Sequence, residues 1–269
     1  MSSPAPRVGV TVASPRFARP AALVGRNLMV QKAVPYVWAT GLVEPVFYLL
    51  SIGVGIGHLV GKMPGPNGAE VPYAAFVAPA LLASSAMNGA VYECTTNIFD
   101  KLHWAKIYRG VVATPLTPRD IAVAEVASAV VRSALYSAAF LVAMAVLSGT
   151  RSPWALLALP CAVLVGLAFA ACGFMSACYM RSWTDFDKVM LVQMPLFLFS
   201  ATFYPLSVFP RWLQLLVEAA PLYQGVAACR ELCLGQPSWD IIGHLAYLAA
   251  LAGAAMAIST RRATKLLTP

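Results

Sequence analysis

Six long stretches of this chain are apolar and almost free of charged side chains, and they constrain the fold more than any other feature. They cover residues 36–57, 73–92, 121–147, 153–179, 189–209 and 241–259. A helix that crosses a bilayer needs about 20 predominantly apolar residues. Only 11% of the residues are charged, whereas soluble domains carry about 25%. The sequence therefore predicts an all-α integral membrane protein with six transmembrane helices.

The distribution of lysine and arginine predicts the orientation, because these residues are enriched in cytoplasmic segments. With the N-terminus inside, fourteen of the nineteen basic residues fall in cytoplasmic segments and four fall outside. We therefore expect a cytoplasmic N-terminal segment 1–35, a transmembrane domain 36–260 and a cytoplasmic tail 261–269. In a membrane protein, the net charge of +8 indicates contact with anionic lipid headgroups rather than with nucleic acid.

The N-terminal segment contains a predicted amphipathic helix that follows Pro20, a residue suited to the first turn of a helix. Ala21, Val24 and Leu28 fall on one side of this helix, and Arg26 falls on the other. This pattern is typical of a helix that lies in the plane of the membrane interface.

The cytoplasmic loop between spans two and three contains a second amphipathic segment, residues 99–112. Its apolar stripe follows helical spacing and consists of Trp104, Ile107, Tyr108 and Val111. Lys106 and Arg109 point away from that stripe. Two interpretations stay open at this point: a plain interfacial helix, or a docking helix for a cytoplasmic partner.

Proline and glycine interrupt the apolar sequence between the fifth and sixth spans. The interruptions are Tyr204-Pro205, Pro210, Pro221, Gly235 and Pro237. Proline favours a first turn, and glycine favours the position just past a helix end. The pattern predicts two short helices, at 210–219 and 221–234, each only about 15–20 Å long. Because neither can span the bilayer, we expect a re-entrant helical hairpin in the outer leaflet.

Ionisable residues inside the spans are costly to bury and must find partners. Glu125 and Arg132 are seven residues apart, which places them on one face of span three. Glu44 in span one and Glu93 near the inner end of span two are candidate partners. The group is either a buried polar cluster that joins helices or the lining of a cavity or gate.

The motifs of common enzymes are missing. The string GHLVGKM at 57–63 has the wrong spacing for a phosphate-binding loop, and neither HExxH nor GxSxG occurs. Asp185-Phe186-Asp187 has the form of a metal-binding DxD, but it falls in a short loop. Cys229 and Cys233 have no histidine near them in sequence. We therefore expect no catalytic residue, metal site or cofactor of this chain's own.

Several sequence strings together resemble one family. These strings are FLFSATFYPL at 197–206, FPRWL at 209–213, PLYQGV at 221–226 with Arg230, YECT at 92–95, ATPLT at 113–117, and Asp120-Ile121 with Glu125. They resemble the signature of ABC-2 type transporter permeases, in particular the nodulation lipo-oligosaccharide exporter and daunorubicin-resistance branches. The resemblance covers about residues 15–260. The chain departs from the usual pattern at Ala124, Ala201 and Gln224, where the family often has Gly, Gly and His.

The resemblance implies a transport subunit of a bacterial inner membrane without a nucleotide site of its own. ATP and Mg²⁺ would be bound by a separate cytoplasmic ATPase dimer, and the permease would pair with a second copy or a paralogue. The cargo would be a lipid, a lipid-linked glycan or an amphiphilic drug.

The resemblance also implies roles for particular residues. The coupling segment, which contacts the ATPase, would include Trp104, Lys106, Ile107, Tyr108 and Arg109. The outer hairpin gate would include Tyr204, Pro205, Pro210, Pro221, Tyr223, Gln224, Arg230 and Glu231. The intramembrane polar residues Glu44, Glu93, Glu125 and Arg132 follow instead from their positions in the predicted spans.

Two alternatives from other functional classes stay open. An ion-coupled carrier or channel would use Glu44, Glu125 and Arg132, although no inverted repeat is visible in the sequence. An intramembrane enzyme acting on lipid-linked glycans would draw on Glu93, His103, Asp185 and Asp187, although these residues form no recognisable motif.

Overall fold

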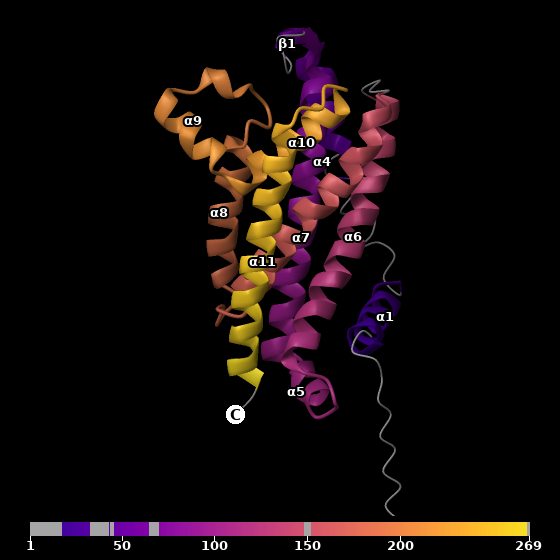
Figure 1. Ribbon diagram of the computed structural model, residues 1–269, viewed down its shortest axis with the longest axis vertical. Helices are drawn as coiled ribbons and strands as arrows, with labels where there is room; N and C mark the ends of the chain where they lie inside the picture. Colours follow the sequence, from indigo (N-terminus) through magenta and orange to yellow (C-terminus); the bar gives the residue numbers. More distant parts are fainter. Residues whose placement is uncertain (1–17, 33–42, 44–45, 65–69, 148–151, 268–269) are drawn as a thin grey trace, which may run out of the picture.

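The computed structural model describes residues 18–32, 43, 46–64, 70–147 and 152–267. This part of the chain is an elongated bundle of helices (Figure 1). The longest elements are α4 (Tyr73–Tyr92), α6 (Pro118–Leu147), α7 (Ala158–Ala177) and α11 (Asp240–Leu267). Two π-helical turns, η3 (Glu93–Asn97) and η4 (Asp100–Trp104), extend α4, and a 3₁₀ turn, η5 (Pro153–Leu157), precedes α7.

Four helices of the described residues are long and apolar enough to cross a membrane. They cover Tyr73–Trp104, Pro118–Leu147, Pro153–Ala177 and Asp240–Leu267. These helices contain or largely overlap the predicted spans two, three, four and six. The chain is thus a helical protein of the membrane type.

The other two predicted spans have different outcomes. Part of the first, predicted at 36–57, lies outside the described residues, and its described part contains the apolar helix Val46–Val60, which includes η1 (Leu49–Ile56) and α3 (Gly57–Val60). The fifth, predicted at 189–209, is the helix α8 (Asp185–Phe199), which begins earlier and ends ten residues sooner. The backbone leaves the helix because Ala201 has a positive φ of 52°. The hydroxyl of Thr202 donates to the carbonyl of Phe197 and closes the turn.

The centre of the bundle is α4, most of whose residues are buried against α6, α7 and α10. Two glycines allow the helices around α4 to pack closely against one another. A Cβ at Gly166 of α7 would overlap the Ser133 side chain of α6, and a Cβ at Gly225 of α10 would overlap Val165 of α7. Small residues at helix contacts are typical of proteins in lipid, where close van der Waals packing drives association.

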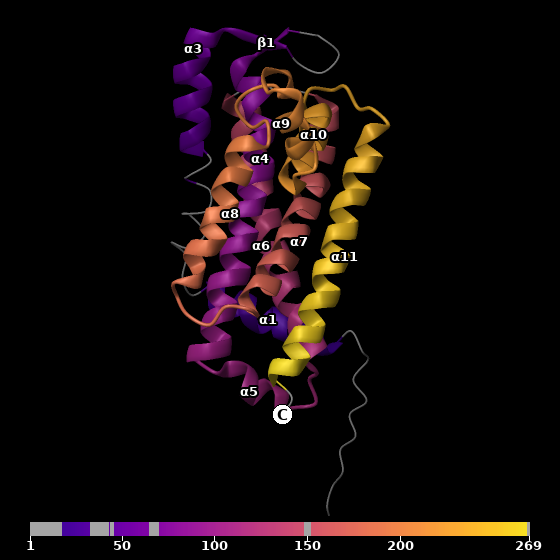
Figure 2. The same cartoon turned by 90° about the vertical axis from the view of Figure 1, so that its left-hand side faces the viewer.

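The two ends of the bundle carry different short elements (Figure 2). One end has the antiparallel strands β1 (Lys62–Pro64) and β2 (Glu70–Pro72), in which Lys62 is opposite Pro72. It also has η6 (Leu206–Val208), α9 (Arg211–Glu218) and α10 (Pro221–Cys233). The bounds of α9 and α10 agree closely with those of the two predicted hairpin helices, 210–219 and 221–234. The opposite end has α5 (Ile107–Val112) and the C-terminal end of α11. Helix α1 (Ala18–Lys32) lies beside α6, nearer to the α5 end.

Candidate functional site

The segment expected to be one amphipathic helix at 99–112 is two pieces with a sharp break between them. The extension of α4 ends at Trp104, and Lys106 adopts the left-handed conformation with φ 50° before α5 begins. This break places Trp104 and Tyr108 in different surroundings, since Trp104 is 68% exposed and Tyr108 only 3%. The predicted single stripe was therefore wrong, because the left-handed Lys106 breaks the helix within it. Lys106 and Ile107 are exposed, and Arg109 lies in α5 with a side chain outside the described part.

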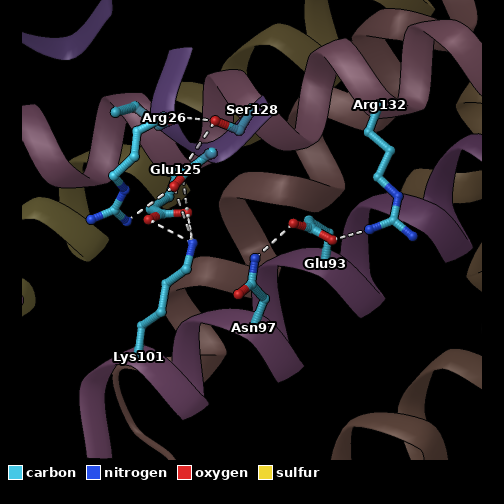
Figure 3. Close-up of polar contacts among 9 residues, drawn as sticks. Arg26, Glu93, Asn97, Lys101, Glu125, Ser128 and Arg132 are labelled. Carbon is cyan, nitrogen blue, oxygen red and sulfur yellow. Dashed lines mark hydrogen bonds and ion pairs between the residues drawn. The ribbon is translucent and has the colours of Figure 1, made fainter. Parts of the chain in front are cut away.

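Glu125 of α6 is the centre of a buried polar junction, which we call the Glu125 junction and which consists of Asn27, Lys101, Glu125 and Ser128. Lys101 Nζ lies 3.0 and 2.8 Å from the two carboxylate oxygens of Glu125. Asn27 Nδ2 donates to Glu125 Oε2 at 3.0 Å and to Ser128 Oγ at 3.2 Å. Lys101 also donates to Asn27 Oδ1 at 3.5 Å. The junction joins α1, the end of α4 and α6 (Figure 3).

The second buried ion pair joins Arg132 of α6 to Glu93 in the first turn of η3. Arg132 Nε donates to the hydroxyl of Tyr136 at 2.8 Å, and Asn97 Nδ2 donates to Glu93 at 2.7 Å. Glu93 was a candidate partner in the sequence, and the structure places it against Arg132. Glu125 and Arg132 share α6 as expected but belong to different ion pairs (Figure 3). Glu44 lies outside the described residues.

Lys101 and Asn27 were not among the predicted site residues. A signal for Lys101 was present, because Glu93, Asn97 and Lys101 are four residues apart and follow one helical face beyond the predicted end of span two. For Asn27 no comparable signal exists, since its partner Glu125 is 98 residues away along the chain.

At the other end of the bundle, Arg230 of α10 is buried rather than exposed. Its Nη2 donates to the carbonyl of Ala201 at 2.7 Å, and its Nε donates to the carbonyl of Phe76 at 3.3 Å. The guanidinium also lies 3.9 Å from the centre of the Phe76 ring. Arg230 thus holds together α10, α4 and the break that follows α8, and it satisfies a carbonyl that the broken helix leaves without a helical partner.

The neighbouring residues of the predicted outer gate link the short helices to α11. Gln224 donates to the carbonyl of Glu218 at the end of α9 and contacts Nδ1 of His244 on α11. Glu231 accepts two hydrogen bonds from Ser238, at 3.1 and 2.7 Å. His244 was not among the predicted site residues, although its Nε2 lies 4.0 Å from Glu231.

The remaining residues of the predicted gate mark the ends of elements. Pro205 and Pro210 precede η6 and α9, and Pro221 is the first residue of α10. Tyr204 is 43% exposed, and its ring packs edge-on against Phe209. Tyr223 lies in α10 and is partly buried. The prolines therefore shape the backbone, and exposed side chains near them include Tyr204, Arg211 and Trp212.

A pocket of about 530 Å³ lies between α8 and the helices α4, α7 and α11. Its lining is apolar along most of its length, with Met87, Phe169 and Leu251 as examples. Asp185 and Lys188 line the pocket from the first turn of α8. No residue of α8 is buried, so this helix stands off from the bundle along the pocket.

The described residues contain no group of three or more histidine, cysteine, aspartate or glutamate side chains that could hold a metal ion. Cys161 and Cys229, whose sulfur atoms are 3.5 Å apart, are buried free thiols between α7 and α10. Their surroundings are those of packing residues.

Comparison with known proteins agrees with this architecture. Nodulation protein J of Rhizobium leguminosarum bv. trifolii is 32% identical over 208 residues, which cover 77% of this chain and 78% of the relative. Nodulation protein J of R. leguminosarum bv. viciae is 31% identical over the same length and shares. Nodulation protein J of Rhizobium meliloti is 28% identical over 246 residues, or 91% and 92% of the two chains. Residues 21–234 match the family described as ABC-2 type transporter, and this chain belongs to that family.

Proposed function

We propose that this chain is the membrane subunit of an ATP-driven exporter that moves an amphiphilic glycolipid, such as a lipo-oligosaccharide, out of the cytoplasm or the inner leaflet. Membership of the ABC-2 type transporter family supports a transport role. The resemblance of the sequence motifs to the nodulation lipo-oligosaccharide exporter branch supports the glycolipid class. ATP hydrolysis would take place on a separate ATPase dimer. Two copies of the chain, or one copy and a paralogue, would form the pathway in a bacterial inner membrane.

The proposal includes six crossings with both termini in the cytoplasm. The four long apolar helices supply four crossings. The apolar helix Val46–Val60 extends the predicted first span. Helix α8 is about 22 Å long by its 15 residues, which is less than the hydrocarbon thickness of about 30 Å. The fifth crossing is then completed by residues 200–209, and α9 and α10 form a hairpin that returns into the outer leaflet.

One observation carries the coupling proposal: the Glu125 junction lies next to the segment that presents Trp104. Trp104 is exposed and ends η4, three residues before α5 begins, and the basic residues predict the cytoplasm at this end of the bundle. Three residues before this tryptophan, Lys101 is paired with Glu125 of α6, which also holds Asn27 of α1. A movement imposed on Trp104 by an ATPase would therefore pass directly to α6 and α1. Tyr108, being buried, anchors α5 to the bundle instead of contacting the partner.

The test is copurification of the ATPase subunit with the permease after coexpression. Trp104→Glu removes an exposed aromatic contact, so we expect loss of the ATPase while the permease keeps its elution volume. Trp239→Glu is the matched control, because Trp239 is 87% exposed at the opposite end of the bundle. Equal copurification with both variants would contradict the coupling role of Trp104.

Transport assays separate this proposal from the two alternatives. In proteoliposomes that contain both subunits, we expect glycolipid movement only with ATP. Movement driven by an ion gradient without the ATPase would indicate a carrier. Conversion of a lipid-linked sugar by the permease alone, without ATP, would indicate an enzyme.

A further inference from the structure

The pocket beside α8 has the shape of a groove that follows this helix from its first turn. The lining residues on α8 run from Asp185 to Leu196. Eleven helical steps correspond to about 16 Å. One leaflet of hydrocarbon is about half of the 30 Å core. The groove therefore has the length of a single leaflet.

The polarity of the groove changes along its length. Its interior is lined by methionine, valine, leucine and phenylalanine side chains, with Gln193 as a polar residue that donates to Asn88 of α4 at 2.7 Å. Asp185 and Lys188 stand at its α5 end. An occupant that fits this pattern has a long apolar part and one polar end, so neither water nor a soluble metabolite is suitable.

The polar end of the groove has two basic side chains near it, Lys188 and Arg262, beside the carboxylate of Asp185. The ammonium of Lys188 lies 2.5 Å from Asp185 Oδ1, but it has three N–H donors and its side chain is 78% exposed. Asp185 also accepts hydrogen bonds from the backbone N–H groups of Arg181 and Ser182, so Lys188 is one of three groups that stabilise its carboxylate. Tyr179 lines the groove, and the guanidinium carbon of Arg262 of α11 lies 4.9 Å from the centre of the Tyr179 ring.

We propose that this groove holds one anionic phospholipid of the inner leaflet, with its acyl chains between α8 and the bundle and its phosphate near Lys188 and Arg262. The inference rests on the membrane orientation in the proposed function. The bound lipid would fill the space that separates α8 from α7 and α11. An unfilled apolar space would forfeit the dispersion contacts of its lining, and headgroup attraction to the basic residues would select anionic lipids.

The occupancy test uses the full chain in nanodiscs of equal parts phosphatidylglycerol and phosphatidylcholine, followed by native mass spectrometry. We expect one retained lipid per chain, with phosphatidylglycerol in excess. Val192→Trp places a large ring in the groove and should abolish retention. Leu191→Trp is the matched control, because Leu191 is the neighbouring exposed residue of α8 and does not line the groove.

The selectivity test removes charge in matched pairs. Lys188→Gln combined with Arg262→Gln should lower the ratio of phosphatidylglycerol to phosphatidylcholine about fivefold for each charge. Arg261→Gln combined with Lys265→Gln removes the same charge from exposed positions of α11 and should leave the ratio unchanged. Equal retention of both lipids by the unmodified chain, or full retention by Val192→Trp, would overturn the proposal.

A last arm separates a resident lipid from transported cargo. With the ATPase and ATP present, a resident lipid stays bound during turnover, whereas release on each cycle would overturn its assignment as resident. The lipid-retention test and the ATPase-copurification test can fail separately. Lipid retention without any ATPase complex would contradict only the exporter function, and a stable ATPase complex without lipid retention would contradict only the lipid site.

Discussion

The ammonium of Lys101 lies 2.8 Å from Glu125 Oε2, and the two side chains, in η4 and α6, are only 10% and 6% exposed. Burying two charges is costly, and a pair of this kind rarely increases stability over a well-packed apolar pair. Its value here is the fixed geometry that it gives to α1, α4 and α6.

Lys101→Met should be strongly destabilising, because it leaves Glu125 buried without its cation. The expected loss is about 3–5 kcal/mol of unfolding free energy, measured by unfolding the detergent-solubilised protein. The double variant Lys101→Met with Glu125→Leu should recover most of that loss. Lys62→Met is the control, since the Lys62–Glu70 pair is 3.5 Å apart and both side chains are about 70% exposed. A change below about 1 kcal/mol is expected there. Similar losses for Lys101→Met and Lys62→Met would refute the structural role of the junction.

The two buried ion pairs should act independently. Glu125 pairs with Lys101 and Arg132 pairs with Glu93, and the two positions on α6 are two helical turns apart, about 10 Å. Glu125→Gln and Arg132→Gln should therefore add within about 0.5 kcal/mol in a double-mutant cycle. A coupling energy well above that value would mean that the pairs form one network.

Replacing Arg230 should loosen the break that follows α8. Arg230→Met leaves the carbonyl of Ala201 without its donor, and Arg230→Lys keeps the charge but loses the planar group that reaches both carbonyls. We expect a loss of about 1–3 kcal/mol for the methionine variant and faster proteolysis at residues 200–210. Arg211→Met serves as control, because Arg211 is exposed and donates to Gln214 on its own helix α9. Unchanged proteolysis of Arg230→Met would contradict the bracing role.

Gly225 should tolerate no side chain. Gly225→Ala places a Cβ on Val165, and such overpacking costs about 1–3 kcal/mol. Adding Val165→Ala should restore stability, since it removes the overlapping methyl groups. Gly243→Ala in α11 meets open space and should be neutral or stabilising by up to about 1 kcal/mol. The midpoint of thermal unfolding measures the stability of each variant. An unchanged midpoint for Gly225→Ala would show that α7 and α10 leave room for a Cβ at this position.

The sequence by itself determined the membrane class, the positions of four long spans and the two short helices near 211–233. These features depend on local properties: apolar length, the fixed φ of proline and the freedom of glycine. The family resemblance likewise depends on short sequence motifs, such as FLFSATFYPL at 197–206. The single continuous helix at 99–112 and the continuous fifth helix to residue 209 were wrong, because the left-handed residues Lys106 and Ala201 are ordinary in sequence.

Only the tertiary structure decided which charged groups meet. Lys101 finds Glu125 across 24 residues, and Arg230 finds Phe76 across 154 residues. Periodicity places a residue on a helix face, but the partner depends on which helices pack together and at what height. In the protein interior, that packing is set by close contacts such as Gly166 against Ser133, which no local pattern records.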